Sequence, residues 1–80
     1  MKDGDLQIVG IKKSEKDGNV SYTIHALTNF ETWENGKGLK VVSEWTRADL
    51  SNIEVNSICT PIYGRGYQGK AVLKGLQVVK

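Results

Sequence analysis

Apolar residues along this chain follow the two-residue period of a β-strand and not the 3.6-residue period of a helix. This pattern predicts an all-β chain. We expect five strands, at Leu6–Ile11, Val20–Phe30, Leu39–Trp45, Ile58–Tyr63 and Lys70–Val79. In the second strand, alternation predicts one face formed by Val20, Tyr22, Ile24 and Ala26 and another formed by Ser21, Thr23, His25 and Leu27.

Turn residues separate these segments. Asp17-Gly18 lies between two β-prone runs, and both residues tolerate the positive φ of a primed turn, so a hairpin is expected there. Glycines mark two further loops, Glu31–Gly38 and Gly64–Gly69. Pro61 cannot donate a ladder hydrogen bond, which predicts that the fourth strand lies at an edge or bulges at that point.

One short helix is expected between the third and fourth strands, at Thr46–Ile53, with Thr46 as its N-cap and Asp49 at N3. Three strands, a helix and two strands is the element order of an OB-fold. An SH3-like barrel is the alternative, because it also has five strands at this length. We therefore expect a single OB-fold-like domain over residues 1–80, a five-stranded barrel with one short helix.

The length and the single cysteine limit how the fold is stabilised. A chain of 80 residues buries one modest core. Cys59 is the only cysteine, which excludes a disulfide within the chain and favours a reducing setting. The polar start, Met1–Asp5, has no apolar signal-like region, and no apolar run approaches the roughly 20 residues of a membrane span. We expect a cytoplasmic protein with no membrane contact.

The sequence offers little for catalysis. Cys59 and His25 cannot form a closed zinc site, and their alternating strand positions favour a buried thiol and a strand-face imidazole over a nucleophile–base pair. The segment Gly64–Gly69 matches Gly-x-Gly-x-x-Gly, but a β-prone run follows it instead of the helix that a dinucleotide site needs. We expect no catalytic residue, no metal and no cofactor.

Charge is distributed unevenly along the chain, whose net charge is +2. Residues 1–54 carry seven Lys/Arg and nine Asp/Glu, whereas residues 55–80 carry four Lys/Arg and no acid. Such a basic end on a near-neutral body favours an anionic partner. The alternative is that the distribution arises by chance and serves solubility.

Proteins that bind single-stranded nucleic acid combine a cationic groove with exposed rings, and each stacked base contributes roughly 1–3 kcal/mol. Trp33 and Tyr67 lie in glycine-bounded loops, which suits stacking. For the strand aromatics Phe30, Tyr63 and above all Trp45, a position in the core is the favoured alternative. The candidate rings are Phe30, Trp33, Tyr63 and Tyr67, and the candidate phosphate contacts are Lys40, Arg65, Lys70 and Lys74.

The segment Gly64–Val79 resembles the C-terminal hairpin of the small single-stranded-DNA-binding proteins of filamentous phages. There, a glycine-rich tip bearing an aromatic residue precedes a closing strand with a Leu-x-Val-like end. The resemblance implies a dimeric OB-like barrel that coats single strands during replication, with Tyr67 at the tip and Lys74 near DNA. The family's Pro- and Tyr-rich central loop is absent, and Trp33 would take its place.

Two functions follow as expectations. The first is a single-stranded-DNA-binding protein of a phage, plasmid or other mobile element, without sequence specificity. The second is a small β-barrel protein-interaction module, in which Trp33, Tyr67 and the Pro61 strand form an aromatic groove. A homodimer is expected in addition, with its seam at the fifth strand or at the tip Gly64–Gly69, because unpaired edges favour self-pairing.

Overall fold

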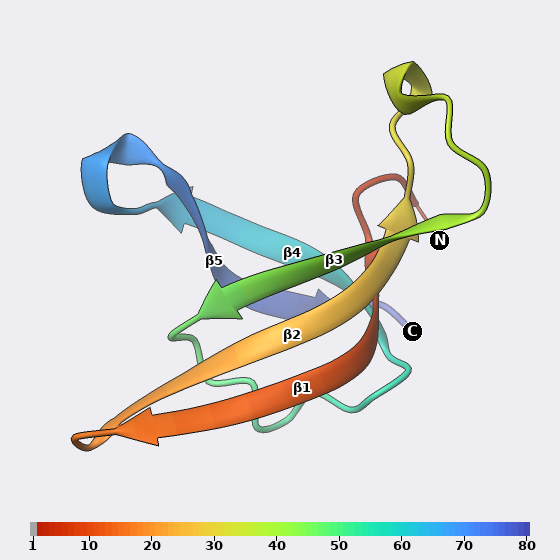
Figure 1. Ribbon diagram of the computed structural model, residues 1–80. Helices are drawn as coiled ribbons and strands as arrows, with labels where there is room; N and C mark the ends of the chain where they lie inside the picture. The colour runs from red at the N-terminus through yellow and green to blue at the C-terminus, as the bar shows by residue number, and fades with distance from the viewer. Residues whose placement is uncertain (1) are drawn as a thin grey trace.

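The computed structural model describes residues 2–80, apart from the side chain of Tyr67, and shows an all-β protein (Figure 1). Two 3-10 turns, η1 (Thr32–Glu34) and η2 (Tyr67–Gly69), are the helical segments of this described part. The strands are β1 (Leu6–Lys16), β2 (Asn19–Asn29), β3 (Leu39–Thr46), β4 (Ile58–Arg65) and β5 (Ala71–Val78). The prediction of five strands is confirmed. None of the helical segments in residues 2–80 is long and apolar enough to cross a membrane.

All five strands belong to one antiparallel sheet with the order β3-β2-β1-β4-β5. The predicted hairpin at Asp17-Gly18 is confirmed, and both residues have positive φ, 53° and 79°. This turn lets β1 continue to Lys16, beyond the apolar run that predicted it. The first half of the chain is thus a meander of three long strands.

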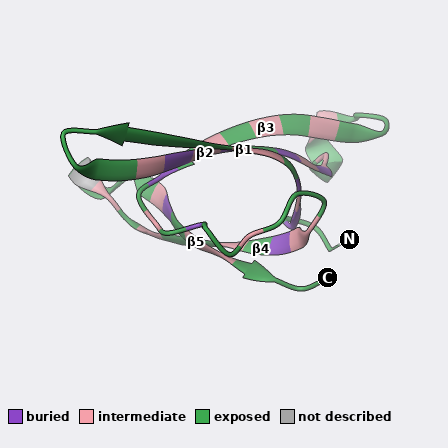
Figure 2. Cartoon of the chain, turned by 90° about the horizontal axis from the view of Figure 1, so that it is seen from below, coloured by how far each residue is buried: buried purple, intermediate pink, exposed green. Residues whose placement is uncertain are grey.

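The sheet is not closed, because β3 and β5 remain its outer strands. The closed barrel expected from the element order is therefore not observed. Seen from below, β1, β2 and β3 form one layer and β4 and β5 the other (Figure 2). The outer strands approach each other without pairing, and the Thr46 hydroxyl donates a buried 2.6 Å hydrogen bond to the Leu73 carbonyl across the gap.

The core lies between these two layers. Tyr22, Ile24 and Ala26 are buried, which confirms three of the four residues expected on one face of β2, whereas Val20 lies exposed near the turn. They pack with buried apolar residues from the other segments, namely Leu6, Ile8, Leu50, Cys59 and Leu73. The exposed or half-exposed residues of β2 point away from this core.

The helix expected at Thr46–Ile53 is wrong, since residues 47–57 form turns and bends. Local side-chain bonds explain the difference. The Ala48 amide donates to the Thr46 hydroxyl at 3.0 Å, and the Ser51 amide donates to the Asp49 carboxylate at 2.9 Å. Such short-range acceptors compete with the helical ladder and favour turns. Leu50 is buried at the centre of this segment and holds it against the core.

Two further predictions concern the burial of Trp45 and the edge position of Pro61. Trp45 was expected in the core, but its side chain is 54% exposed. Because Thr46 points inward to reach Leu73, its neighbour Trp45 must point outward. β4 is not an outer strand, since it lies between β1 and β5, but it pairs with β1 only at Ile58 and Cys59, so Pro61 itself has a paired neighbour only on the β5 side. The register with β5 also shifts close to Pro61, between Ile62 and Tyr63.

Candidate functional site

An exposed tryptophan and an arginine form a stacked pair at the end of β3. The guanidinium carbon of Arg47 lies 5.6 Å from the centre of the Trp45 ring. At this distance a cation–π attraction orients both side chains. The pair combines a flat aromatic surface with a fixed positive charge, and both side chains are exposed.

A cleft of about 440 Å³ separates the end of β3 from the β4–β5 hairpin. Trp45 and Arg47 line one wall, and Gly66, Val72 and Lys74 line the other. The cleft lies where the sheet is open, next to the Thr46–Leu73 hydrogen bond between β3 and β5. It brings the basic final hairpin beside the Trp45–Arg47 pair, a relation that the sequence order does not reveal.

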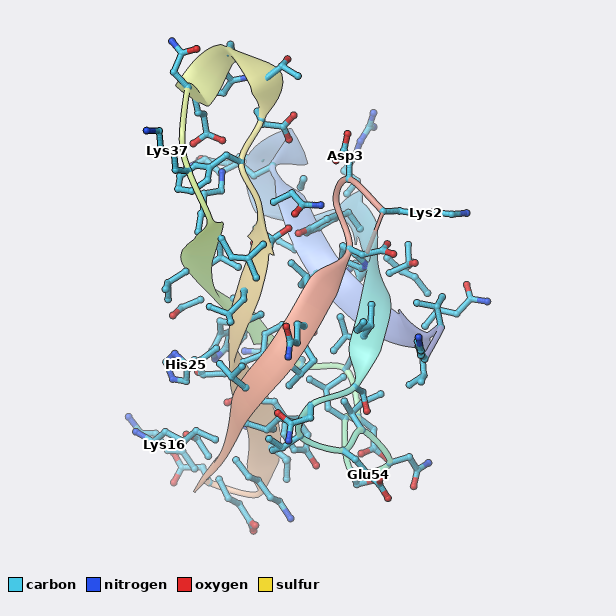
Figure 3. The ribbon with its side chains drawn as sticks, turned by 90° about the vertical axis from the view of Figure 1, so that its right-hand side faces the viewer. Lys2, Asp3, Lys16, His25, Lys37 and Glu54 are labelled. Carbon is cyan, nitrogen blue, oxygen red and sulfur yellow. The ribbon has the colours of Figure 1, made fainter. Side chains whose placement is uncertain are left out.

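A second hollow, of about 260 Å³, lies on the other side of this pair. Trp45 and Arg47 line it together with residues of the β1–β2 hairpin end, among them Lys16 and Asp17. Lys16 projects at the end of that hairpin, far from Lys37 in the β2–β3 loop (Figure 3). The pair is thus flanked by two hairpin ends, each with a lysine.

A third hollow beside Arg47 is less suited to an anion. It is lined by Lys13, Tyr22 and Asp49. Hydrogen bonds from Ser51, and then from the Tyr22 hydroxyl, hold the pKa of the Asp49 carboxyl below its usual value despite an opposing effect of burial. This carboxylate therefore stays ionised at neutral pH and disfavours a phosphate on that side.

The basic residues predicted on the final hairpin are exposed. Arg65, Lys70 and Lys74 all face solvent. The aliphatic part of Lys74 lies over the backbone of Gly64, where an added Cβ would come within 2.8 Å of the Lys74 Cγ. A side chain at position 64 would therefore require Lys74 to shift. The predicted ring of Tyr67 lies outside the described residues.

Lys40, at the start of β3, is paired with a residue of the preceding loop. Its ammonium donates to the Glu34 carboxylate at 2.8 Å, and the two side chains form an ion pair. The Glu31 amide donates to the same carboxylate oxygen, also at 2.8 Å. The hydrogen bond from Lys40, followed by that from Glu31, lowers the pKa of Glu34. The predicted phosphate contact of Lys40 stays a prediction, and it would require this pair to open.

The predicted rings Trp33, Tyr63 and Phe30 do not gather with the Trp45–Arg47 pair. Trp33 is 77% exposed on η1, at the end of the β2–β3 loop. Tyr63 is half-exposed, and its hydroxyl donates to Glu44 at 3.4 Å. Burial, and then the Glu44 charge, raises the pKa of Tyr63. Phe30 is half-buried because its ring packs against Gly36, where a Cβ would meet it at 2.3 Å.

Cys59 and His25 lie on different faces of the sheet. Cys59 is fully buried in the core, and burial raises the pKa of its thiol. His25 projects from the outer side of β2, where its Nδ1 lies 2.9 Å from the Ser43 hydroxyl (Figure 3). They cannot act as a nucleophile–base pair. Within the described residues, no three His, Cys, Asp or Glu side chains lie close enough to hold a metal ion.

Sequence reasoning missed Trp45 and Arg47 as site residues. A tryptophan at the end of an apolar strand is typical of a core residue, so Trp45 was not considered as a binding residue. The spacing could have found the pair only if the extended backbone had been expected to continue past Trp45, since residues i and i+2 of a strand share a face. Arg47 lies one residue beyond the end of β3, and its guanidinium still reaches the Trp45 ring.

Comparisons with protein-family models, with curated proteins and with solved structures found no match for this chain. The resemblance of the final hairpin to phage proteins therefore stays a prediction. The structure itself defines a class: a single open antiparallel sheet with an exposed tryptophan–arginine pair between two hairpin ends.

Proposed function

We propose that this protein binds single-stranded DNA without sequence specificity, on the surface around Trp45. The observation that carries the proposal is the exposed Trp45–Arg47 pair between two lysine-bearing hairpin ends. An aromatic ring stacks on any base because every base has a π-face, and nearby cations neutralise the phosphates. A surface with both features suits a single strand better than a small rigid ligand.

The strand order supports the same proposal. We infer that the sheet is an OB-like barrel left partly open between β3 and β5. OB-folds are five-stranded, partly open barrels that bind oligonucleotides on the face of their second and third strands and on the loops between strands 1 and 2 and strands 4 and 5. The Trp45–Arg47 pair lies on the outer face of β3, with these two loops on either side.

Residue roles follow from position. Trp45 supplies the stacking ring. Arg47 and Lys74 face each other across the larger cleft and contact phosphates, with Lys16 on the other side. Arg65 and Lys70 extend the cationic surface along the final hairpin. Trp33 lies outside this surface, on a loop that also carries Glu31 and Glu34, and Lys40 lies at the start of β3 next to that loop.

The salt dependence of binding to labelled oligo-dT tests the charge assignments. The logarithm of affinity falls with the logarithm of salt concentration, with a slope of about −0.7 per phosphate neutralised on a single strand. Removing one contacting cation should therefore make the slope shallower by about 0.7. We expect this for R47Q and K74Q, but not for the control K40Q, whose lysine is paired with Glu34. Absence of binding at low salt would contradict the proposal, as would equal effects of all three variants.

A protein-interaction module is the second candidate, and the loop around Trp33 favours it. The 3-10 turn, the Glu31–Glu34 capping box and the Lys40–Glu34 pair hold this loop in one conformation and present Trp33 at its tip. Exposed tryptophans on rigid supports often serve as binding anchors. If this is the main function, W33A should abolish capture of a protein partner while oligo-dT affinity, if any, stays unchanged.

A further inference from the structure

We propose that the outer edge of β3 pairs with the same edge of a second copy of this chain, antiparallel, about a two-fold axis at Val41. This inference does not depend on nucleic-acid binding. It concerns the half of β3 between Leu39 and Ser43, which lies away from the Thr46–Leu73 bond that links β3 with β5. In residues 2–80, no strand other than β2 pairs with β3.

The edge of β3 lacks prolines and bulges, two of the features that normally prevent strand pairing. Proteins also protect sheet edges with charges, lysines above all, including charges that point inward. β3 carries two charged residues, of which Lys40 is paired with Glu34 and Glu44 lies outside the segment 39–43. β3 contains no proline, and its register with β2 runs without a shift over all eight residues. Its outward-facing residues, Leu39, Val41, Ser43 and Trp45, carry no charge.

The other outer strand, β5, is protected. Its register with β4 shifts between Ile62 and Tyr63, which leaves Lys74 opposite no residue. Lys74 is also exposed, and a bulge with a charged residue is a typical edge protection. Thr46 holds the middle of β5 against β3 in addition. The seam expected at the fifth strand is therefore less favourable than one at β3.

A second copy suits the β3 edge because the strand is self-complementary about Val41. Val41 is the most exposed of the large apolar residues of β3, at 73%, and this register places it opposite Val41 of the second copy. Leu39 then lies opposite Ser43, and Lys40 opposite Val42, so no like charges face each other. Identical patches related by a two-fold axis form closed dimers. The outer strands that remain are the two copies of β5, which are protected as described above.

The pairing also enlarges the proposed binding surface. Two sheets joined through β3 present their outer faces side by side, so the two Trp45 rings lie on one continuous surface. In the proposed register each ring remains beyond the paired segment 39–43. A dimer would therefore bind a longer strand than a monomer, with both sites available.

Analytical ultracentrifugation over a wide concentration range tests the inference. We expect a reversible dimer for the unchanged protein. V41K places like charges opposite each other across the axis, and should weaken dimerisation by at least roughly tenfold. V78K is the matched control, because Val78 is likewise an exposed valine, at 49%, but lies on β5. A protein that stays monomeric at every concentration would overturn the inference, and so would dissociation by V78K but not by V41K.

Cross-linking gives a second readout that survives if V41K fails to fold. Opposite residues of antiparallel strands have Cα atoms about 4.5–5.5 Å apart, within the range of a disulfide. V41C should form a disulfide-linked dimer on mild oxidation, and V78C should not. The native Cys59 does not interfere, because it is fully buried. Equal cross-linking of both variants, or none by V41C, would contradict the proposed seam.

Discussion

At the scale of single residues, Thr46 has more influence on the fold than its size suggests. Its hydroxyl is buried, donates to Leu73 and accepts from the Ala48 amide. T46V removes both bonds and leaves a buried carbonyl without its partner, which costs about 1–3 kcal/mol of unfolding free energy. Urea denaturation measures this loss. T23V is the control, because Thr23 lies on the outer face of β2, and an effect as large as that of T46V would contradict the assigned role.

Cys59 provides a second prediction at this scale. Its side chain is fully buried, and burial raises the pKa of the thiol, so the reactive thiolate is scarce at neutral pH. We expect the folded protein to react with a thiol reagent far more slowly than the urea-unfolded chain. Raising the pH should speed the folded reaction only once it approaches the raised pKa. Equal rates in the folded and unfolded states would show that Cys59 is accessible.

At the scale of elements, the β1–β2 turn tests how strongly local conformation fixes the hairpin. Gly18 has φ of 79°, a value that costs an L-residue about 1–2 kcal/mol. G18A should therefore lower the unfolding free energy by about that amount, measured in urea. G10A is the matched control, because a Cβ there would only touch His25 at an ordinary 3.6 Å. Equal losses for the two variants would contradict a conformational origin.

These elements also show what the sequence could predict. Alternation and turn residues located all five strands and the Asp17-Gly18 hairpin, because both are local properties. The helix at Thr46–Ile53 failed because Thr46 and Asp49 cap helices and form turns with the same side-chain bonds. The local bonds therefore do not decide between the two conformations in the sequence. The burial of Leu50 and the contact of Thr46 with Leu73 add to these bonds in favour of the turns, and both depend on strands distant in the sequence.

At the scale of the whole molecule, the same limit applies to the candidate site. The basic final hairpin was visible in the sequence, and its charges are exposed as expected. The sequence did not show that this hairpin lies close to Trp45 and Arg47, because this proximity arises from the bending of one sheet into two layers (Figure 2). The molecule is elongated and extends 42 by 30 by 18 Å. Trp33 lies in the loop before β3 and Trp45 lies near the end of β3, so the two tryptophans report on different regions.

The two tryptophans make fluorescence the most direct test of the central claim that DNA stacks on Trp45. W33F retains Trp45 as the reporter, and W45F retains Trp33. On titration with oligo-dT at low salt, we predict strong fluorescence quenching of W33F and little quenching of W45F. The affinity of W45F for oligo-dT should also be weaker by roughly 5- to 150-fold, the equivalent of about 1–3 kcal/mol for one stacked base. Quenching of W45F with undiminished affinity would contradict the account.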